Sequence, residues 1–477
     1  MARILSDILK IYSVARYEAR ILLRSWIFWI LSLFGLAIII FMNIGIYALA
    51  GIFTFGAVGS LVPYFSFYTF NYLQAVVVIF LATEFKKRER GAITEDVIKT
   101  TPISTAAYIT GKFLGVCIPV VFLNLIIIGL SIVMQLAFTQ TAFSVYPYFI
   151  YTLVITVPTT VFIISLVFLL MSLVRSQAIT LLLAVGYTSL ILFYLKNRIE
   201  GLFDYATFFT PLFYSDFIGF GNWESIITQR LIYITLGIFF LSLSAAIYPR
   251  LKEKGRISIP VVITSFISLT CFSLFLYIYL FKYVDAKNVR KEELAVQSEL
   301  SRIQIPSIYH YDINISIDKN TMYADVMVKV RNLRPVPLDT LVFTLNRGLR
   351  IESIQTLKGD ELSFERIYSV IIIPGNSSKN SVLKNFDFLS SGDSLKLRIK
   401  YSGKIDPNSM YLDIPERDLK KSQNVAFLQI GKVYSYIGKN FLILPPTSSW
   451  YPTAGVRYGH KYPSVPEVQY ATARIKI

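Results

Sequence analysis

Seven apolar stretches constrain what this chain can fold into more than any other feature of its sequence. A helix needs about 20 apolar residues to cross about 30 Å of hydrocarbon. The predicted spans cover residues 26–48, 62–83, 113–136, 149–171, 178–195, 231–249 and 260–282. Hydrophobic residues make up 54% of the chain and charged residues only 16%, whereas soluble domains carry about 25% charged residues. We therefore expect an α-helical polytopic membrane domain over residues 26–283.

The connections between the spans differ in charge, and this difference predicts their orientation. Lys and Arg are retained on the cytoplasmic side of a membrane. The N-terminal segment and one set of connections carry sixteen of them, whereas the opposite set carries three, Lys196, Arg198 and Arg230. The sequence therefore predicts a cytoplasmic N-terminus and an extracytoplasmic segment after Lys282. The expected location is a bacterial inner (plasma) membrane.

The first 25 residues are predicted to form a cytoplasmic interfacial helix. Apolar residues such as Ile4, Ile8 and Ile11 recur at helical spacing, and charged residues fall on the other side. An ordinary solvated helix is the alternative interpretation.

The predicted spans contain no Asp, Glu, Lys or Arg near their middles, and their polar residues include Asn43, Asn71 and Asn124. Carriers coupled to protons or ions usually need ionisable groups at that depth. We therefore expect any transport to draw its energy from elsewhere. The amides are interpreted as hydrogen-bonding groups between helices rather than as a substrate site.

A charged segment follows the second span, and residues 84–104 read EFKKRERGAITEDVIKTTPIS. Ile93, Val97 and Ile98 give a short helix one apolar edge. Pro102 ends that helix, because proline disfavours a helical residue before it. A short helix lying across the membrane face is suited to docking on a cytoplasmic partner, and a solvated loop is the alternative.

This segment resembles the coupling-helix region of ABC-type exporter permeases, the class that includes polysaccharide and drug exporters. The residues that carry the resemblance are Glu84, Arg88, Arg90, Gly91, Glu95, Thr101, Pro102, Ser104, Gly111 and Lys112. The resemblance covers residues 1–250 and implies a coupling helix at 84–104 and short re-entrant helices at 202–213 and 217–223. It implies ATPase-coupling roles for Glu84, Arg88, Arg90, Gly91, Glu95 and Pro102. A seventh span, at 260–282, departs from the family pattern.

The resemblance also implies partners. The sequence has no G-x-x-x-x-G-K-[ST] phosphate loop, so ATP and Mg are expected on a separate cytoplasmic ABC ATPase subunit and no cofactor is expected in this chain. Permeases of this class work in pairs, which implies a homodimer or a second permease subunit. Residues 284–477 carry 27 Lys and Arg against 19 Asp and Glu, spread along the sequence. No nucleic-acid partner is predicted, because such partners require a clustered basic block.

After a predicted stalk or linker at 284–304, the period changes from helical to alternating. The clearest strand has Leu395, Leu397, Ile399 and Tyr401 interleaved with Lys396, Arg398 and Lys400, which is typical of one buried and one solvated face. Turn signals recur at 318–320, 374–376 and 391–393. Residues 305–477 are therefore predicted to form an extracytoplasmic all-β sandwich domain.

Residues 309–318, 323–332 and 442–452 resemble the N-terminal β-sandwich of gluzincin aminopeptidases. In that family a zinc-binding catalytic domain follows, and its H-E-x-x-H motif is absent here, where the histidines are His310 and His460. We therefore expect no metal site and no catalytic residue in this sequence. Its last residues lie in an alternating pattern, so the sequence is expected to be a fragment of a longer product or a domain closed by a partner strand.

Two functions follow. The first is the permease subunit of an ATP-driven exporter, with an extracytoplasmic sandwich for substrate or partner interaction and unknown substrate-binding residues. The alternative is a membrane anchor or scaffold that presents a peptidase-like domain, as part of a longer membrane-bound aminopeptidase.

Overall fold

The computed structural model describes most of the chain, in two compact units. The described residues are 2–50, 59–83, 103–138, 143–174, 176–195, 198–210, 212, 214–215, 219–248, 258–301, 303, 305–375, 389–412, 414, 435–438, 442–456 and 471–477. Met1–Tyr283 belong to the first unit, called the helical unit below. The second, called the sheet unit, begins at Val284.

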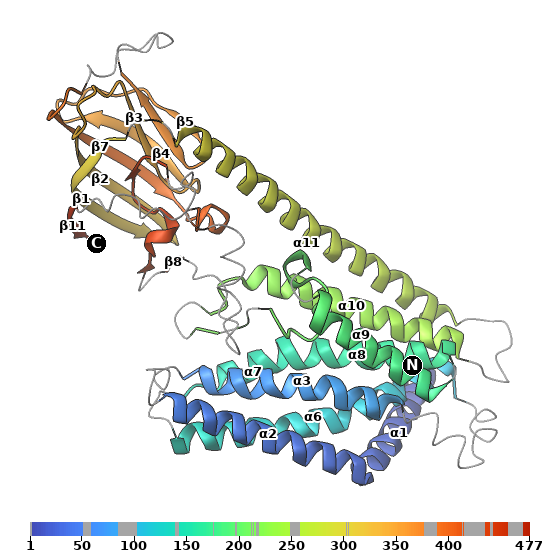
Figure 1. Ribbon diagram of the computed structural model, residues 1–477. Helices are drawn as coiled ribbons and strands as arrows, with labels where there is room; N and C mark the ends of the chain where they lie inside the picture. The colour runs from blue at the N-terminus through green and yellow to red at the C-terminus, as the bar shows by residue number, and fades with distance from the viewer. Residues whose placement is uncertain are drawn as a thin grey trace. The chain divides into compact units, whose positions relative to one another are not determined.

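The helical unit is built from long apolar helices (Figure 1). They are α1 (Ala2–Arg24), α2 (Trp26–Ala50), α3 (Leu61–Thr83), α6 (Thr105–Phe138), α7 (Tyr146–Tyr151), α8 (Val157–Val174), α9 (Gln177–Leu190), α10 (Trp223–Ile247) and the first part of α11 (Ile259–Leu300). Shorter turns are η2 (Thr152–Thr156), η3 (Ile191–Leu195) and η4 (Arg198–Gly201). Of the described residues, seven stretches are helical, long and apolar enough to cross a membrane, and they overlap the seven predicted spans.

Large apolar side chains cover much of the outer surface of the helical unit. Phe41, Leu182, Phe193 and Phe266 are each at least 70% exposed, although they lie in long apolar helices. Water would make such a surface an aggregation site, whereas lipid accepts it at no cost. This exposure indicates that the helical unit is embedded in a membrane.

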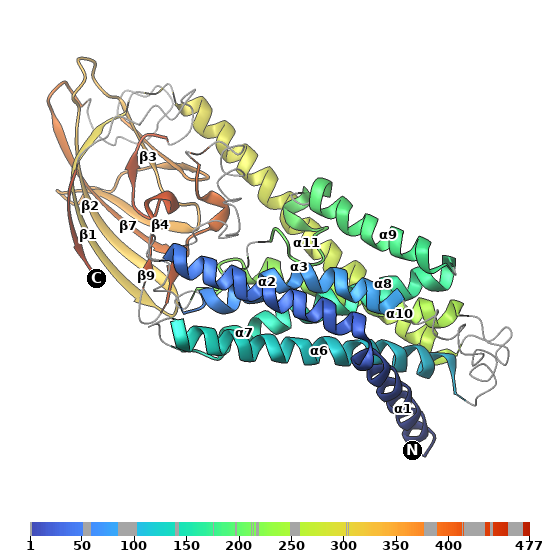
Figure 2. The ribbon, with the colours of Figure 1, turned by 60° about the horizontal axis from the view of Figure 1, so that its bottom comes forward.

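The interior of the helical unit is organised around α3. This helix contacts α2, α6, α8 and α9, and Figure 2 shows α2, α3 and α6 running side by side. Helices α8 and α10 also pack closely, because α10 carries Gly237 at their crossing. A Cβ atom there would lie 3.1 Å from the Phe162 Cα of α8. Small residues at such crossings let two backbones approach.

The described residues of the sheet unit form two larger sheets and a small one. The strands are β1 (Ser307–Asp318), β2 (Thr321–Arg331), β3 (Thr340–Thr344), β4 (Leu349–Thr356), β5 (Glu365–Ile367), β6 (Val370–Pro374), β7 (Ser394–Gly403), β8 (Tyr436–Ile437), β9 (Leu442–Ile443), β10 (Thr453–Ala454) and β11 (Thr472–Lys476). One sheet has the order β11-β1-β2-β7-β4, another has β10-β3-β6-β5, and β8 pairs with β9.

The two larger sheets share one hydrophobic core. Val326 and Val328 of β2 belong to the same buried cluster as Phe343 of β3 and Ile371 of β6. The alternating pattern predicted for residues 395–401 holds, because Leu397, Ile399 and Tyr401 of β7 are buried in that cluster. The C-terminal region is therefore a β-sheet structure, as its sequence predicted.

The β1–β2 hairpin illustrates how the turn signals act. Asp318 pairs with Thr321, so the loop consists of Lys319 and Asn320, which have φ angles of 45° and 70°. Two-residue loops with positive φ at both positions match the right-handed twist of the strands they join. This turn fixes the register of the longest strand pair in the unit.

Helix α11 is continuous from Ile259 to Leu300. Its residues up to Tyr283 belong to the helical unit and those from Val284 belong to the sheet unit. The segment expected as a stalk or linker at 284–304 thus contains the last turns of this helix, and Glu293 and Gln297 within it are at most 1% exposed.

Candidate functional site

The predicted coupling residues Glu84, Arg88, Arg90, Gly91, Glu95 and Pro102 lie outside the described residues. The structure describes the helices that precede and follow these residues. Helix α3 ends at Thr83, and α6 begins at Thr105. The Ser104 hydroxyl accepts a hydrogen bond from the Ala107 N–H at 3.2 Å, which caps the start of α6.

The first turns of α6 pack closely against α1. Gly111 and Gly115 lie one helical turn apart on α6 and face α1. A Cβ atom at Gly115 would lie 2.5 Å from the Glu18 Cβ and 3.0 Å from the Ala15 carbonyl oxygen. This small-x-x-x-small spacing lets two backbones meet. The N-terminal helix is therefore joined to the helix that directly follows the predicted coupling segment.

A buried ion pair strengthens the same contact. The Lys112 ammonium of α6 donates to the Glu18 carboxylate of α1 at 3.2 Å, and both side chains are less than 10% exposed. Removing one partner of a buried pair leaves an uncompensated charge. The α1–α6 contact is thus fixed by charge as well as by shape. Elsewhere on α1, Ile8, Leu9 and Tyr12 are exposed; the interfacial position predicted for the first 25 residues stays a prediction.

The segment between α9 and α10 is irregular. Helices were expected at 202–213 and 217–223 from the family resemblance, but the described residues there form turns, and α10 begins at Trp223. Ile199 and Glu200 have positive φ angles of 51° and 50°, a conformation that non-glycine residues rarely adopt. The structure therefore replaces the expected re-entrant helices, within the described part, by a folded loop.

Asp204 organises this loop from inside. Its carboxylate is fully buried and accepts hydrogen bonds from three backbone N–H groups, those of Phe208, Phe209 and Thr210, at 2.8, 2.7 and 3.1 Å. The Thr210 hydroxyl adds a fourth at 3.2 Å. A carboxylate that accepts this many donors remains stable in a buried position. Asp204 therefore holds the 204–210 turn together.

Arg230 ties the same loop to α10. Its guanidinium donates to the backbone carbonyls of Asp204 and Tyr205, both at 2.8 Å, and lies over the Tyr233 ring. The side chain is 2% exposed, and its Nε has no partner among the described residues. The sequence prediction that Arg230 lies in a solvated loop is wrong, because α10 begins seven residues before it.

Sequence analysis missed this buried centre. The prediction that the spans lack ionisable residues concerned only the middle of each apolar stretch. Arg230 instead lies in the second turn of α10, and Asp204 lies in a loop. One signal was available: the stretch from Gly201 to Arg230 is rich in aromatic residues and contains three acids, Asp204, Asp216 and Glu224, and one base, Arg230. Charges in such surroundings are usually paired or hydrogen-bonded.

The amides of the spans form contacts with other parts of the helical unit. Asn71 of α3 donates to the Ala206 carbonyl, and Asn43 of α2 donates to the Ser66 hydroxyl of α3 at 3.2 Å. Asn124 of α6 donates to the Gln74 side chain of α3 at 3.3 Å and accepts from Thr156 at 3.0 Å. The bonds of Asn43 and Asn124 agree with the interpretation of the amides as hydrogen-bonding groups between helices, whereas Asn71 joins α3 to the loop that precedes α10.

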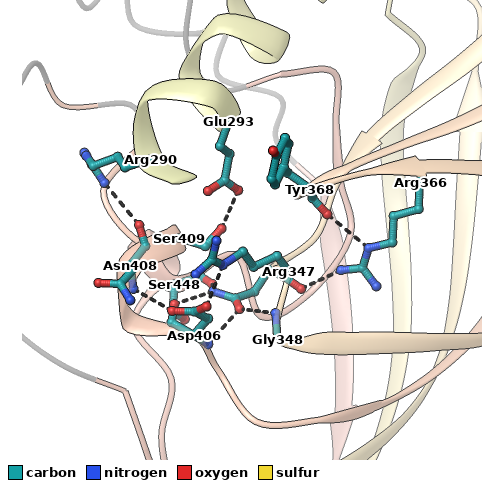
Figure 3. A network of polar contacts seen from close by, with 11 residues as sticks. Arg290, Glu293, Arg347, Gly348, Arg366, Tyr368, Asp406, Asn408, Ser409 and Ser448 are labelled. Atoms are coloured by element: carbon teal, nitrogen blue, oxygen red, sulfur yellow. Dashed lines mark hydrogen bonds and ion pairs between the residues drawn. The ribbon is translucent and has the colours of Figure 1, made fainter. Parts of the chain in front are cut away.

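A second polar centre lies in the sheet unit, where the last turns of α11 meet the 406–411 segment (Figure 3). The Arg290 guanidinium donates to the Met410 carbonyl at 2.7 Å and to the Tyr411 carbonyl at 2.9 Å. One turn further along, the Glu293 carboxylate accepts from the Ser409 hydroxyl at 2.5 Å. Its other oxygen, Oε2, has no partner among the described residues. The helix is therefore docked on the sheet unit by charged side chains.

Asn346 is the hub of the neighbouring turns. Its side-chain oxygen accepts from the N–H groups of Gly348 and Asp406 at 2.9 and 2.8 Å. Its side-chain nitrogen donates to the carbonyls of Asp406 and Ser448 at 3.1 and 2.9 Å. All four hydrogen-bonding positions of the amide are thus used. The adjacent Arg347 forms an ion pair with Asp406 at 2.5 Å, which Figure 3 shows beneath α11.

Two titratable groups near this centre respond to their surroundings. Burial lowers the pKa of the Arg366 guanidinium, and the nearby Glu293 carboxylate partly opposes that shift. The hydrogen bond that the Tyr368 hydroxyl donates to Glu292 of α11 raises the pKa of Tyr368. The Tyr368 pKa shift follows from a contact with α11, whereas the Arg366 pKa shift follows chiefly from burial.

The histidines show no catalytic arrangement in the described part of the chain. His310 of β1 shares a 2.6 Å hydrogen bond with the Thr472 hydroxyl of β11. His460 lies outside the described residues. Among the residues that the structure describes, no group of three His, Cys, Asp or Glu side chains is placed to hold a metal ion.

Comparisons with known proteins do not assign this chain to a family. No family model and no curated protein match the chain. An M1 zinc metallopeptidase mutant from Deinococcus radiodurans, solved with a Tyr-Ser-Ala substrate, is similar over 25% of this chain and 24% of its own length, with 20% identity and a TM-score of 0.19. Native yeast LTA4 hydrolase is similar over 21% of this chain and 14% of its own length, with 17% identity and a TM-score of 0.16. The chain thus spans at most about a quarter of either structure, and scores this low carry no conclusion about fold or activity.

Proposed function

We propose that this chain is the permease subunit of a dimeric ATP-driven exporter of the ABC type. A separate cytoplasmic ATPase binds ATP and Mg and docks on the segment at 84–104. ATP binding closes the ATPase dimer and pushes on this segment, which tilts the adjoining helices between inward-open and outward-open states. The sheet unit lies on the extracytoplasmic side of the bacterial inner membrane, as the distribution of Lys and Arg predicts.

The observation that carries the proposal is the contact between α1 and α6. The segment at 84–104 leads directly into α6, and α1 packs on the first turns of that helix through Gly111, Gly115 and the Lys112–Glu18 ion pair. A push on the segment reaches α6, and α6 carries α1 with it. Such a joint supports a role for the segment in moving helices, which a solvated loop would not require.

The proposal is tested by purifying the chain with its ATPase and measuring ATP hydrolysis and transport together. We expect Arg88→Ala and Glu95→Ala to lower transport per ATP hydrolysed at least tenfold while the complex still folds. Arg256→Ala, in another predicted cytoplasmic connection, is the matched control and should leave the ratio unchanged. Unchanged coupling in both variants would contradict the role assigned to the segment.

The second candidate is a membrane anchor that presents the sheet unit as a scaffold or as part of an aminopeptidase. The continuous helix α11 favours it, because the last turns of that helix are docked on the sheet unit by Arg290 and Glu293. An anchor needs no ATPase. Deleting the segment at 84–104 would then leave function intact, whereas the exporter would lose transport.

A further inference from the structure

The basic residues of the sheet unit are scattered along the sequence, but strand pairing gathers them on one face. This face, called the basic face below, is formed by the outward side chains of β1, β2, β7 and β11. Its basic members are Lys329, Arg331, Lys396, Arg398, Lys400, Arg474 and Lys476, and its acidic members are Asp312, Asp318 and Asp325. The opposite side of β1, β2 and β7 forms the hydrophobic core.

Two lysines form the centre of the basic face. The register of β2 and β7 places Lys329 directly opposite Lys396, and His310 of β1 lies opposite Lys329 on the other side. Like charges directly opposite each other destabilise a sheet. In the described part of the chain no carboxylate forms an ion pair with either lysine. The fold thus keeps an unfavourable pair on an otherwise regular strand pair.

Asp325, the acid nearest the two lysines on β2, is already paired with another residue. Asp325 is bound by both nitrogens of the Arg398 fork, at 2.8 and 2.6 Å, and the Arg398 hydrogen bonds lower the pKa of Asp325. Arg331 donates to the Gly392 carbonyl at 3.2 Å. The positive charge at Lys329, Lys396 and Arg331 therefore remains available to an external anion.

We propose that the basic face binds a linear polyanion, with Lys329 and Lys396 at the centre of the site. Outward residues of one strand recur every second residue, about 6.7 Å apart, so Lys329 and Arg331 repeat a positive charge along β2, beside Lys396 of β7. Such a row fits a polymer that repeats an anionic group. A lipid bilayer fits less well, because surface binding also uses inserted apolar side chains. Around the two lysines the outward apolar residue of β2 is the half-buried Met327, whereas the exposed rings of Tyr309 and Tyr323 lie near the ends of their strands.

This inference goes beyond the proposed exporter function and does not depend on an ATPase. The test uses the full chain in nanodiscs of zwitterionic lipid and fluorescently labelled inorganic polyphosphate as the probe. We expect saturable binding that weakens with salt. The double variant K329Q/K396Q should weaken binding at least tenfold.

The matched control is K358Q/K404Q, which removes the same charge at exposed positions outside the four strands. This control should weaken binding less than threefold. A second readout separates function from structure: K329Q/K396Q removes a like-charge contact, so its thermal midpoint should stay the same or rise while binding falls. Equal weakening in both double variants, no binding of polyphosphate by the wild type, or capture of anionic vesicles in place of the polymer would each overturn the proposal.

Discussion

Two buried carboxylates, one in each unit, are held in opposite ways. Asp204 of the helical unit accepts four hydrogen bonds from residues four to six positions further along the chain. Glu293 of the sheet unit accepts one from Ser409, which is 116 residues away in sequence, and its Oε2 has no partner among the described residues. One carboxylate organises its own loop, and the other joins segments that are distant in the chain.

This difference shows that the polar centre of the helical unit depends on contacts local in sequence, whereas the polar centre of the sheet unit depends on long-range contacts. The Asp204 loop is defined by nearby residues and is then attached to α10 by Arg230. The joint around Glu293 and Asn346 exists only when α11 and three separate turns have met. Changes at the first centre should therefore act locally, and changes at the second should loosen several segments together.

The largest loss of stability is expected from a substitution of Asp204 in the helical unit. Asp204→Ala leaves three N–H groups and one hydroxyl buried without their acceptor, which should cost about 3–5 kcal/mol of unfolding free energy. Hydrogen exchange should increase at residues 204–210 and in the first turns of α10. Glu224→Ala, which removes the exposed partner of Lys282, is the control and should cost less than about 1 kcal/mol. Equal costs would contradict the role of Asp204.

A substitution at the polar centre of the sheet unit should loosen more segments than Asp204→Ala but cost less unfolding free energy. Asn346→Ala removes four hydrogen bonds and should destabilise the sheet unit by about 2–3 kcal/mol. Hydrogen exchange should increase together at Gly348, Asp406 and around Ser448, because the amide contacts all three turns. Asn314→Ala, at an exposed position of β1, should change stability by less than about 0.5 kcal/mol. Faster hydrogen exchange in one turn alone would show that Asn346 does not hold the three turns together.

A smaller effect is expected from the close contact of α1 with α6. Gly115→Ala places a Cβ atom against Glu18 and the Ala15 carbonyl, so overpacking should cost about 1–3 kcal/mol. Gly129→Ala lies on the same helix with nothing within 4 Å of the new atom. It should be neutral or stabilise the helix by up to about 1 kcal/mol. Thermal midpoints in detergent measure both, and equal midpoints would argue against a tight contact.

The smallest effect concerns the exposed ion pair of the basic face. Arg398 lowers the pKa of Asp325, so the pair stabilises the folded state fully above the ordinary Asp pKa of about 3.9. That contribution is lost as pH falls through the lowered pKa of the folded state. Because both side chains are partly exposed, solvent screening limits it to about 0.2–1 kcal/mol. Hydrogen exchange of β2 and β7 should differ between wild type and Asp325→Asn at pH 7 and converge near pH 2, and a difference that persists there would contradict the assignment.

The regular elements could be predicted from sequence because their periods are local properties. The seven apolar helices and the alternation at Leu397, Ile399 and Tyr401 follow from side chains that are close in the chain. The hairpin turn at Lys319 and Asn320 is likewise a local signal. These features needed no knowledge of tertiary contacts.

The polar centres could not be predicted, because each one is created by tertiary contacts. Arg230 lies near the end of a charged, aromatic-rich stretch that was interpreted as a loop, and only the helix boundary at Trp223 places it inside the unit. Lys329 and Lys396 are 67 positions apart, and only the β2–β7 register brings them together. Sequence analysis found the basic excess of the C-terminal region but interpreted it as dispersed. The coupling residues Arg88 and Glu95 stay a prediction.

The central claim is that a separate ATPase drives this chain. The most direct measurement is a pull-down of the tagged chain from its native membranes in mild detergent, scored for a stoichiometric ATP-binding subunit and vanadate-sensitive ATP hydrolysis. The account predicts that such a subunit copurifies with the wild type and that its hydrolysis is no longer coupled to transport when Arg88 or Glu95 is changed to alanine. A chain that purifies without any ATPase, at any stoichiometry, would contradict it and favour the membrane-anchored scaffold.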